Sequence, residues 1–274
     1  MTRNRLAFIG ALLVNAPLSA FAQTPMPNDS VHAAKTLFTY RDALLAVGFV
    51  GLTVAMFPVD KSVAKRLQNP SVQANRFFTN GSTDVRLVAD PGGLIFGLSS
   101  YGIGRVARWK NVADLGLHTV EALSVAGLTT KIFDGLAGRA RPFVVHDTNA
   151  TDFRFGQGFR NHDRESFPSG HATSAFAFAS TLTSESERWW PHQAWMVGTV
   201  MYGAAALSGV SRMYNDRHWA SDIVSGAAIG TFAGIKVVRY SHGHPKNLVD
   251  RFFLGSMVAA GPNGETQIGF SFAY

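Results

Sequence analysis

Three short clusters of side chains in this sequence are suited to binding and transferring a phosphate group. They occupy residues 138–142, 166–171 and 211–222, each at the end or the start of a long apolar segment. Arg141 and Arg212 carry guanidinium groups, which are planar forks that match phosphate oxygens. These two arginines are therefore the first candidate phosphate ligands.

The second cluster places small residues where a helix is expected to begin. Ser169 and Gly170 directly precede the apolar segment His171–Thr183. The first backbone N–H groups of a helix have no intrahelical partner and lie at the positive end of its dipole, so they attract anions. Ser169 and Gly170 are thus further candidate phosphate-binding residues.

Two histidines are candidates for the covalent chemistry. His171 follows Gly170, and His218 lies four residues before Asp222. At this spacing Asp222 shares a helix face with His218 and could accept a hydrogen bond from one ring nitrogen, which leaves the other nitrogen free to attack phosphorus. His171 could then protonate the leaving oxygen. A nucleophile, an orienting carboxylate, an acid and an anion clamp are the parts of a phosphoryl-transfer site.

The combination of clusters matters more than any one of them. A lone Ser-Gly-His is more often a helix cap, and a lone Arg-Pro is more often a helix end. Four fixed residue types at fixed offsets, each at about one in twenty, occur by chance with a probability of order 10⁻⁵ per starting position. Their conjunction therefore favours a function.

On these residues the chain resembles the superfamily of type 2 phosphatidic acid phosphatases and vanadium-dependent haloperoxidases, as a bacterial, exported member. The three motifs of this superfamily are Lys-x6-Arg-Pro, Pro-Ser-Gly-His and Ser-Arg-x5-His-x3-Asp. The second is met in full by residues 168–171, and the third by Ser211, Arg212, His218 and Asp222. The resemblance covers roughly residues 93–238.

The resemblance implies a role for each matching residue. His218 would be the phosphorylated nucleophile, Asp222 would orient it, and His171 would be the general acid. The phosphate oxygens would be held by Arg141, Arg212, Ser169 and Gly170. No metal and no cofactor is implied for phosphatase members, whereas vanadate takes the phosphate position in haloperoxidases.

The first motif departs from the pattern. Arg141-Pro142 fits, but the residue seven places earlier is Asp134 rather than lysine. Lys131 lies three residues before it, one helical turn back on nearly the same face, and its flexible stem could still reach the phosphate. Lys131 is therefore expected as the replacement phosphate ligand, with Arg139 as another available cation.

Long apolar segments dominate the remainder and predict an all-α fold, a helical bundle of about six core helices. The expected helices are Tyr40–Phe57, Gly93–Ala107, Val112–Leu136, His171–Thr183, Ala194–Val210 and Ser221–Val238. The polar stretch Phe143–Ser166 has no period and is expected to be a functional or mobile loop. His118, on an apolar helix, is expected to be a hydrogen-bonded core histidine.

The two ends of the chain differ from the predicted phosphatase domain, residues 23–245. Residues 1–22 have an arginine-containing start, an apolar run and an Ala20-Phe21-Ala22 cleavage pattern, which predicts a signal peptide and export to the periplasm or cell envelope. At the other end, Phe252–Ala260 and Thr266–Tyr274 flank a Gly-Pro-Asn-Gly turn, and the second segment alternates apolar and small residues. Residues 246–274 are therefore predicted to be a C-terminal β-hairpin appendage.

Composition narrows the partners. The chain of 274 residues has a net charge of +7 and no cysteine, which excludes disulfides and thiolate metal sites and favours anionic partners. No basic run carries interleaved aromatic residues, so nucleic acid is not an expected partner. Only Ala43–Val59 and Gln193–Ser211 reach the roughly 17–25 uncharged residues that a membrane span needs. This favours a soluble bundle or association with a membrane surface over a polytopic protein.

Three functions follow from these observations. The leading one is a phosphomonoesterase acting on a lipid phosphate or a small soluble ester through a phosphohistidine. The second is a vanadate-dependent haloperoxidase. The third is a catalytically inactive envelope protein of the same fold, motivated by the missing lysine and the hairpin. The sequence fixes neither the substrate nor the oligomeric state.

Overall fold

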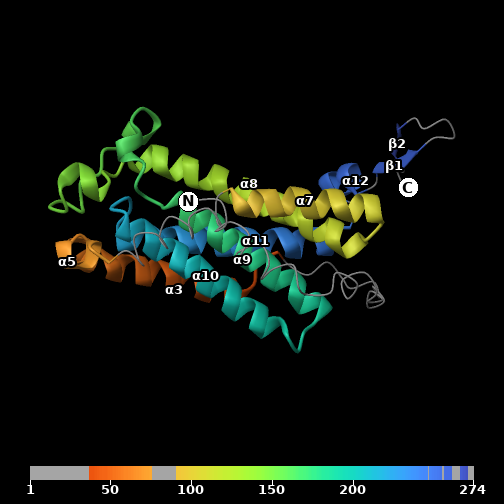
Figure 1. The fold of residues 1–274 in the computed structure, drawn as a ribbon, viewed down its shortest axis with the longest axis horizontal. Helices are drawn as coiled ribbons and strands as arrows, with labels where there is room; N and C mark the ends of the chain where they lie inside the picture. Colours follow the sequence, from red (N-terminus) through yellow and green to blue (C-terminus); the bar gives the residue numbers. More distant parts are fainter. Residues whose placement is uncertain (1–36, 76–90, 246, 255, 261–265, 271–274) are drawn as a thin grey trace, which may run out of the picture.

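The computed structural model describes residues 37–75, 91–245, 247–254, 256–260 and 266–270. The predicted signal peptide, residues 1–22, lies outside these described residues. Where it is described, the chain is a bundle of packed helices, several of which run along the longest dimension of the molecule (Figure 1).

Six long helices form the bundle, and they match the six predicted segments. They are α3 (Tyr40–Met56), α7 (Gly92–Ala107), α8 (Lys110–Ala137), α9 (Gly170–Trp189), α10 (Ala194–Tyr214) and α11 (Ala220–Gly243). Shorter α-helices are α4 (Asp60–Leu67), α5 (Pro70–Gln73) and α12 (Leu248–Phe253). The expected all-α class is therefore correct.

The predicted C-terminal β-hairpin appendage has to be corrected. Phe252 and Phe253, placed in its first strand, belong to helix α12, so the segment after residue 245 begins as a helix. Strand pairing in the described residues is limited to a short ribbon of β1 (Ser256–Ala260) and β2 (Thr266–Phe270). Aromatic residues at 252–253 can pack as well on a helix as on a strand, and here Phe253 lies edge-on to Tyr101 of α7. The fold class is thus helical, without a β unit beginning at residue 246.

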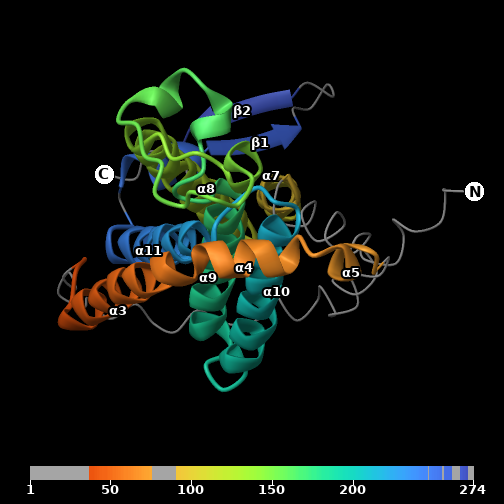
Figure 2. The ribbon, with the colours of Figure 1, turned by 90° about the vertical axis from the view of Figure 1, so that its left-hand side faces the viewer.

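Helix α9 lies at the centre of the bundle and packs against α8, α10 and α11. In the view of Figure 2, α3 and α4 lie on the near side of the bundle, and α3 packs against α11. The approach of α11 to α9 is close because one face of α11 carries Gly226, Gly230 and Gly234. A Cβ at Gly226 would lie 2.5 Å from the carbonyl oxygen of Ser169, and one at Gly230 would meet the carbonyl of Thr173. The glycine face therefore brings the first turns of α9 and α11 side by side.

Gly230→Ala is expected to destabilise the bundle by about 1–3 kcal/mol, because the added methyl overlaps backbone atoms of α9 that cannot move independently. Gly203 of α10 has open space around its Cα, so Gly203→Ala is the matched control and is expected to be neutral or slightly stabilising. Denaturant unfolding of both variants in detergent measures the difference. Equal stabilities would show that α9 and α11 do not pack as closely as this structure has them.

The long polar stretch predicted to be a loop connects α8 to α9. It contains only single-turn 3₁₀ helices, η2 (Pro142–Val145), η3 (Gln157–Phe159) and η4 (His162–Arg164). It turns back at Gly138, which has a left-handed φ of 57°, and Arg139 forms an isolated bridge with Phe153. This loop covers one end of the bundle, opposite the end that carries α12 (Figure 1).

Three helical segments among the described residues are long and apolar enough to cross a membrane: Tyr40–Leu67, Ala194–Tyr214 and Ala220–Gly243. The sequence-based count of uncharged runs missed the third because α11 carries charged residues. Lys236 and Arg239 of α11 lie 2.6 and 2.9 Å from the carboxylate of Asp42 in α3, so their charges are paired. The preference for a soluble bundle is therefore not supported, and many large side chains on α3, α7 and α10 point outward.

Candidate active site

The three sequence clusters meet at the loop-covered end of the bundle. The first follows the end of α8, the second opens α9, and the third joins α10 to α11. The indole of Trp219 ties two of them together, since its Nε1 donates to the carbonyl of Ala140 at 2.9 Å. The backbone N–H of Ser169 donates to the carbonyl of Asp222 at 3.0 Å, which links the second cluster to the third.

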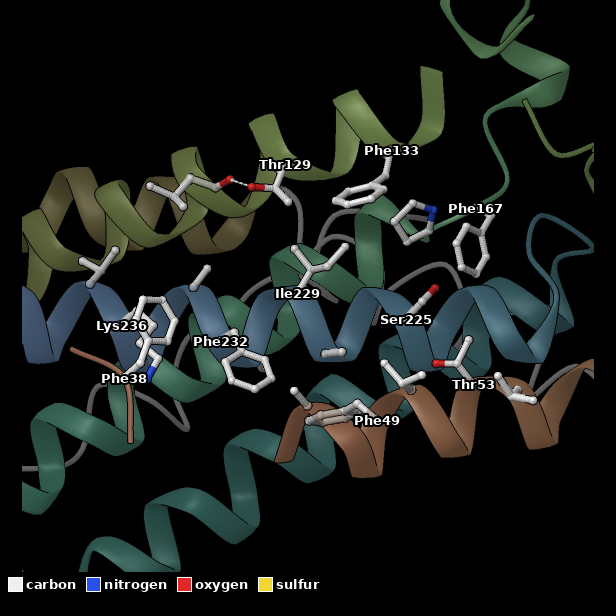
Figure 3. A pocket seen from close by; sticks show the side chains of 18 of the residues that line it. Phe38, Phe49, Thr53, Thr129, Phe133, Phe167, Ser225, Ile229, Phe232 and Lys236 are labelled. Atoms are coloured by element: carbon white, nitrogen blue, oxygen red, sulfur yellow. Dashed lines mark hydrogen bonds between the residues drawn. The ribbon is translucent and has the colours of Figure 1, made fainter. Parts of the chain in front are cut away.

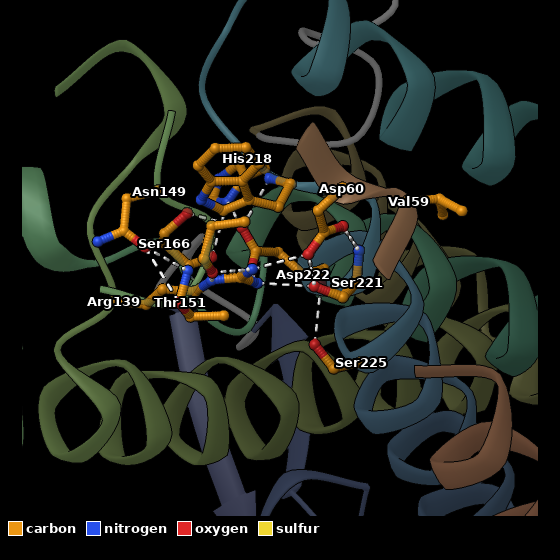
Figure 4. A network of polar contacts seen from close by, with 12 residues as sticks. Val59, Asp60, Arg139, Asn149, Thr151, Ser166, His218, Ser221, Asp222 and Ser225 are labelled. Atoms are coloured by element: carbon orange, nitrogen blue, oxygen red, sulfur yellow. Dashed lines mark hydrogen bonds and ion pairs between the residues drawn. The ribbon is translucent and has the colours of Figure 1, made fainter. Parts of the chain in front are cut away.

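His218 is held in one orientation by the backbone (Figure 4). Its side chain lies just before the start of α11 and is only 4% exposed. Nδ1 lies 2.8 Å from the carbonyl oxygen of Ser166. Because a carbonyl only accepts hydrogen bonds, Nδ1 carries the proton and Nε2 keeps its lone pair. That is the tautomer a nucleophilic histidine requires.

Asp222 supports His218 indirectly. Its Oδ2 lies 3.7 Å from Nδ1 of His218, too far for the direct hydrogen bond expected from the sequence. This oxygen instead accepts from the hydroxyl of Ser166 at 2.6 Å and from the N–H of Trp219 at 2.7 Å. Ser166 and Trp219 are the residues whose backbones set the position of the imidazole. Asp222 thus fixes the frame around His218 and adds a nearby negative charge.

Arg139 and Asp60 form a buried ionic network that sequence reasoning did not find. The Arg139 guanidinium is fully buried and donates to Asp222 Oδ1 at 2.5 Å and to Asp60 Oδ2 at 2.7 Å (Figure 4). Asp60 also accepts from the backbone N–H and the hydroxyl of Ser221, at 2.9 and 2.6 Å. Arg139 is therefore occupied within the protein and does not serve as the replacement phosphate cation. Asp60 could have been noticed as the acid that ends the apolar run beginning at Ala43.

Aromatic rings enclose the Arg139 guanidinium. The ring centroids of Phe57, Phe153 and Trp219 lie 4.9, 5.1 and 5.5 Å from its central carbon. A cation over such ring faces is stabilised by their quadrupoles. The network is thus shielded from water beneath the site.

Arg141 is near enough to His218 for its charge to act on the imidazole. It is half-buried, and its Nε donates to the carbonyl of His162 at 3.1 Å, which leaves the rest of the fork available. Burial lowers the pKa of His218 below the ordinary imidazole value, and the Arg141 cation acts in the same direction. His218 is therefore neutral, and able to attack, at neutral pH.

The lowered pKa of His218 is expected to determine the acid limb of the pH–activity profile. Activity should fall only when His218 becomes protonated, so the midpoint of the acid limb of kcat/KM should lie below pH 6.5. Arg141→Gln removes a cation that lowers the pKa of His218, so it should move this midpoint to higher pH. Arg160→Gln, at an exposed loop position, is the control. A midpoint unchanged by Arg141→Gln would show that the charge of Arg141 does not affect the pKa of His218.

The remaining predicted site residues lie around this centre. Ser169 is buried as the N-cap of α9, where its hydroxyl accepts from the N–H of Ala172 at 3.4 Å. Gly170 and His171 are half-buried and form the first turn of α9. Arg212 is buried in the last turn of α10. All four lie at the loop-covered end of the bundle.

Lys131 is placed away from this set. Its side chain is 63% exposed, and Nζ pairs with Glu165 Oε2 at 2.9 Å. Asp134, at the position of the family's lysine, is buried and has an Oδ1 without a hydrogen-bond partner among the described residues. Burial raises the pKa of Asp134 to about 8, and the negative charges of Glu165 and Asp222 add to the effect. A neutral carboxylic acid therefore stands where the motif has an ammonium group.

Fold and site together define a helical-bundle protein with a histidine, arginine and helix N-terminus arrangement for phosphate groups. Residues 115–245 match the model of the PAP2 superfamily.

Two of the similar proteins are lipid A 1-phosphatases. The protein from Porphyromonas gingivalis is 41% identical over 69 residues, which are 25% of this chain and 15% of that protein. The protein from Rhizobium johnstonii is 29% identical over 142 residues, which are 50% of this chain and 53% of that protein. The chain thus spans about half, or less, of the length of these curated relatives.

A solved structure shares the fold. The crystal structure of a transmembrane PAP2 type phosphatidylglycerolphosphate phosphatase from Bacillus subtilis superposes with a TM-score of 0.57 at 20% identity. The match covers 74% of this chain and 97% of that one. This chain and that protein therefore share a helical fold.

Proposed function

We propose that this chain is a membrane-associated phosphatase that hydrolyses lipid phosphate esters through a phosphohistidine on His218. The observation that carries the lipid specificity is an apolar groove that ends beside the site. The names of the relatives, lipid A 1-phosphatase and phosphatidylglycerolphosphate phosphatase, support the same substrate class.

The groove has a volume of about 700 Å³ and lies between α3, α8 and α11 (Figure 3). One end is formed by Phe167 and Pro168, which join Ser166 to Ser169 at the site. The walls are aromatic and aliphatic, with Phe49, Ile229 and Phe232 among the side chains that point inward (Figure 3). Because α3 and α11 are both candidate membrane spans, an acyl chain could enter the groove directly from the bilayer.

Hydrolysis of the phosphate ester proceeds in two steps. Nε2 of His218 attacks phosphorus, the bond from phosphorus to the ester oxygen breaks, and His171 gives that oxygen its proton. Water then attacks the phosphohistidine, the P–N bond breaks, and His171 takes a proton from the water as inorganic phosphate leaves. Arg141, Arg212 and the N–H groups at the start of α9 stabilise the charge on the non-bridging oxygens in both steps.

The test compares a lipid with a soluble substrate. Purified protein in detergent is expected to release inorganic phosphate from phosphatidic acid with a higher kcat/KM than from an aryl phosphate. Ile229→Trp, which fills the groove, should lower kcat/KM for the lipid by at least about tenfold, since displacing two methylenes at ~0.8 kcal/mol each is enough. Activity on the aryl phosphate should be unchanged, because that substrate does not use the groove.

Val200→Trp is the matched control, since Val200 is exposed on α10 away from the groove. It should behave as wild type on both substrates. If Ile229→Trp and Val200→Trp have equal activity on phosphatidic acid, the groove does not bind the lipid. If neither substrate is hydrolysed by the wild-type chain, the phosphatase assignment itself fails.

A further inference from the structure

A second buried polar cluster lies at the end of the bundle opposite the candidate active site. Its members come from four helices: His118 and Glu121 from α8, Glu185 from α9, His242 from α11 and Asp250 from α12. His118 is sixteen residues before Asp134 on the same helix, a separation of about 24 Å at 1.5 Å per residue. The phosphatase chemistry therefore makes no use of this cluster.

His118 has one nitrogen satisfied and one not. Its Nδ1 lies 2.5 Å from Glu185 Oε1, and a carboxylate accepts, so Nδ1 carries a proton. The residue is only 1% exposed, so Nε2 is shielded from water. Nε2 nevertheless has no hydrogen-bond partner among the described residues. The expectation of a hydrogen-bonded core histidine is thus met at one nitrogen only. The other nitrogen, Nε2, faces the protein interior.

Two carboxylates lie near Nε2 of His118. Asp250 Oδ1 lies 3.9 Å from Nε2 and is also buried without a hydrogen-bond partner in the described part of the chain. One ligand atom each from His118, Glu121 and Asp250 fall within 4.8 Å of one another. Ligands at 2.0–2.2 Å from a tetrahedral ion are separated by about 3.4 Å, so small side-chain rotations would close the site.

We propose that His118, Glu121 and Asp250 bind a divalent transition-metal ion such as Zn²⁺. One imidazole and two carboxylates form a donor set that suits zinc and its neighbours in the first transition series. This site is separate from the proposed phosphatase activity and does not depend on it.

Glu185 and His242 complete the arrangement behind the ligands. Glu185 is fully buried and accepts from His118 Nδ1 and from His242 Nε2, the latter at 3.0 Å. A carboxylate that accepts from the far nitrogen of a metal-binding histidine fixes its tautomer and raises its basicity. Glu185 is already hydrogen-bonded to Nδ1 of His118 and Nε2 of His242. The ion is therefore assigned to the other nitrogen of His118, Nε2.

The charge of the region favours a cation. Asp114, one turn before His118, adds a further buried carboxylate whose Oδ1 has no hydrogen-bond partner among the described residues. Several carboxylates held close together in a bundle interior are costly unless a cation offsets them. Glu121 also lines a groove of about 620 Å³ together with Ser241 and Val249, which gives an ion a route to the site.

The test is the metal content of the full chain. Protein purified in detergent without chelators, or stripped and then titrated with Zn²⁺, is expected to hold about one equivalent by elemental analysis. His118→Gln and Asp250→Asn should each lose the ion, whereas His192→Gln, at an exposed position, should keep it. Glu185→Gln should weaken binding by about 10–100-fold, as removal of a partner behind a ligand does.

A second measurement on the wild-type chain does not depend on any variant folding. Co²⁺ added to stripped protein should give visible absorption bands of a protein-bound ion, and Zn²⁺ should displace them. Retention of the ion by His118→Gln at the level of His192→Gln would overturn the assignment of these ligands. Less than about a tenth of an equivalent of Zn²⁺ after titration, with no cobalt spectrum, would overturn the site as a whole.

Discussion

His218→Ala is expected to abolish phosphate release, with a loss in kcat of at least about 10³-fold, the scale on which removal of a nucleophile acts in covalent catalysis. His218 is the histidine whose geometry leaves a lone pair for attack, because the carbonyl of Ser166 holds the proton on Nδ1 at 2.8 Å. The measurement is release of inorganic phosphate from phosphatidic acid. His146→Ala, at an exposed position in the polar loop, is the control and should retain activity.

The same experiment can identify the intermediate. Rapid quenching of wild-type enzyme with labelled substrate should trap a phosphoryl group that is stable to alkali and released by acid, as expected for phosphohistidine. His171→Ala should accumulate this species with an aryl phosphate, since a good leaving group needs no acid but water still needs a base. His218→Ala should trap none. Near wild-type turnover in His218→Ala would remove His218 from the role of nucleophile.

The reactive residues could be predicted from sequence because they lie in short motifs at helix ends. Ser169 and Gly170 open α9 as expected, and His218 directly precedes the N-terminal turn of α11. The helices themselves could be predicted because their apolar runs are long. Such local patterns contain both the chemistry and most of the secondary structure.

What could not be predicted depends on contacts between distant segments. Asp60 and Arg139 are 79 residues apart, and no local pattern indicates that they meet. The expected Asp222–His218 hydrogen bond rested on spacing alone, whereas Ser166, from another segment, takes that place. Lys131 likewise has the correct helix face for the site, but Glu165 from the polar loop pairs with it. Tertiary partners decided each of these outcomes.

The C-terminal segment shows the same limitation in secondary structure. The prediction of a strand from residue 252 is wrong at its start, because Asn247 caps the helix α12 through its side chain, which accepts from the N–H of Asp250 at 2.9 Å. An asparagine side chain at this position is a helix start signal, and the next six residues are helical. The turn and the alternation that favour a hairpin lie after residue 260 and carry no information on residues 248–253.

Arg139→Met is expected to destabilise the protein by about 3–5 kcal/mol, the second of the two largest effects. Removing this guanidinium leaves the carboxylates of Asp60 and Asp222 buried without their counter-ion. Denaturant unfolding in detergent measures the loss. Arg154→Met is the matched control, because Arg154 is 63% exposed and its pairing with Asp152 at 3.3 Å is a surface ion pair worth about 0–1 kcal/mol.

A double variant separates the loss of the network from the loss of packing around it. Asp60→Asn removes one of the two charges that Arg139 leaves behind, so adding it to Arg139→Met should recover part of the stability. Because the effects of substitutions within one network on the free energy of unfolding are not additive, the coupling energy should fall within about 0.5–3 kcal/mol. The recovered protein should remain inactive, since Asp222 still lacks the guanidinium that holds it beside Ser166 and Trp219. If the two substitutions are additive, the Arg139–Asp60 ion pair contributes nothing to the fold, and the burial of Arg139 among aromatic rings is its main role.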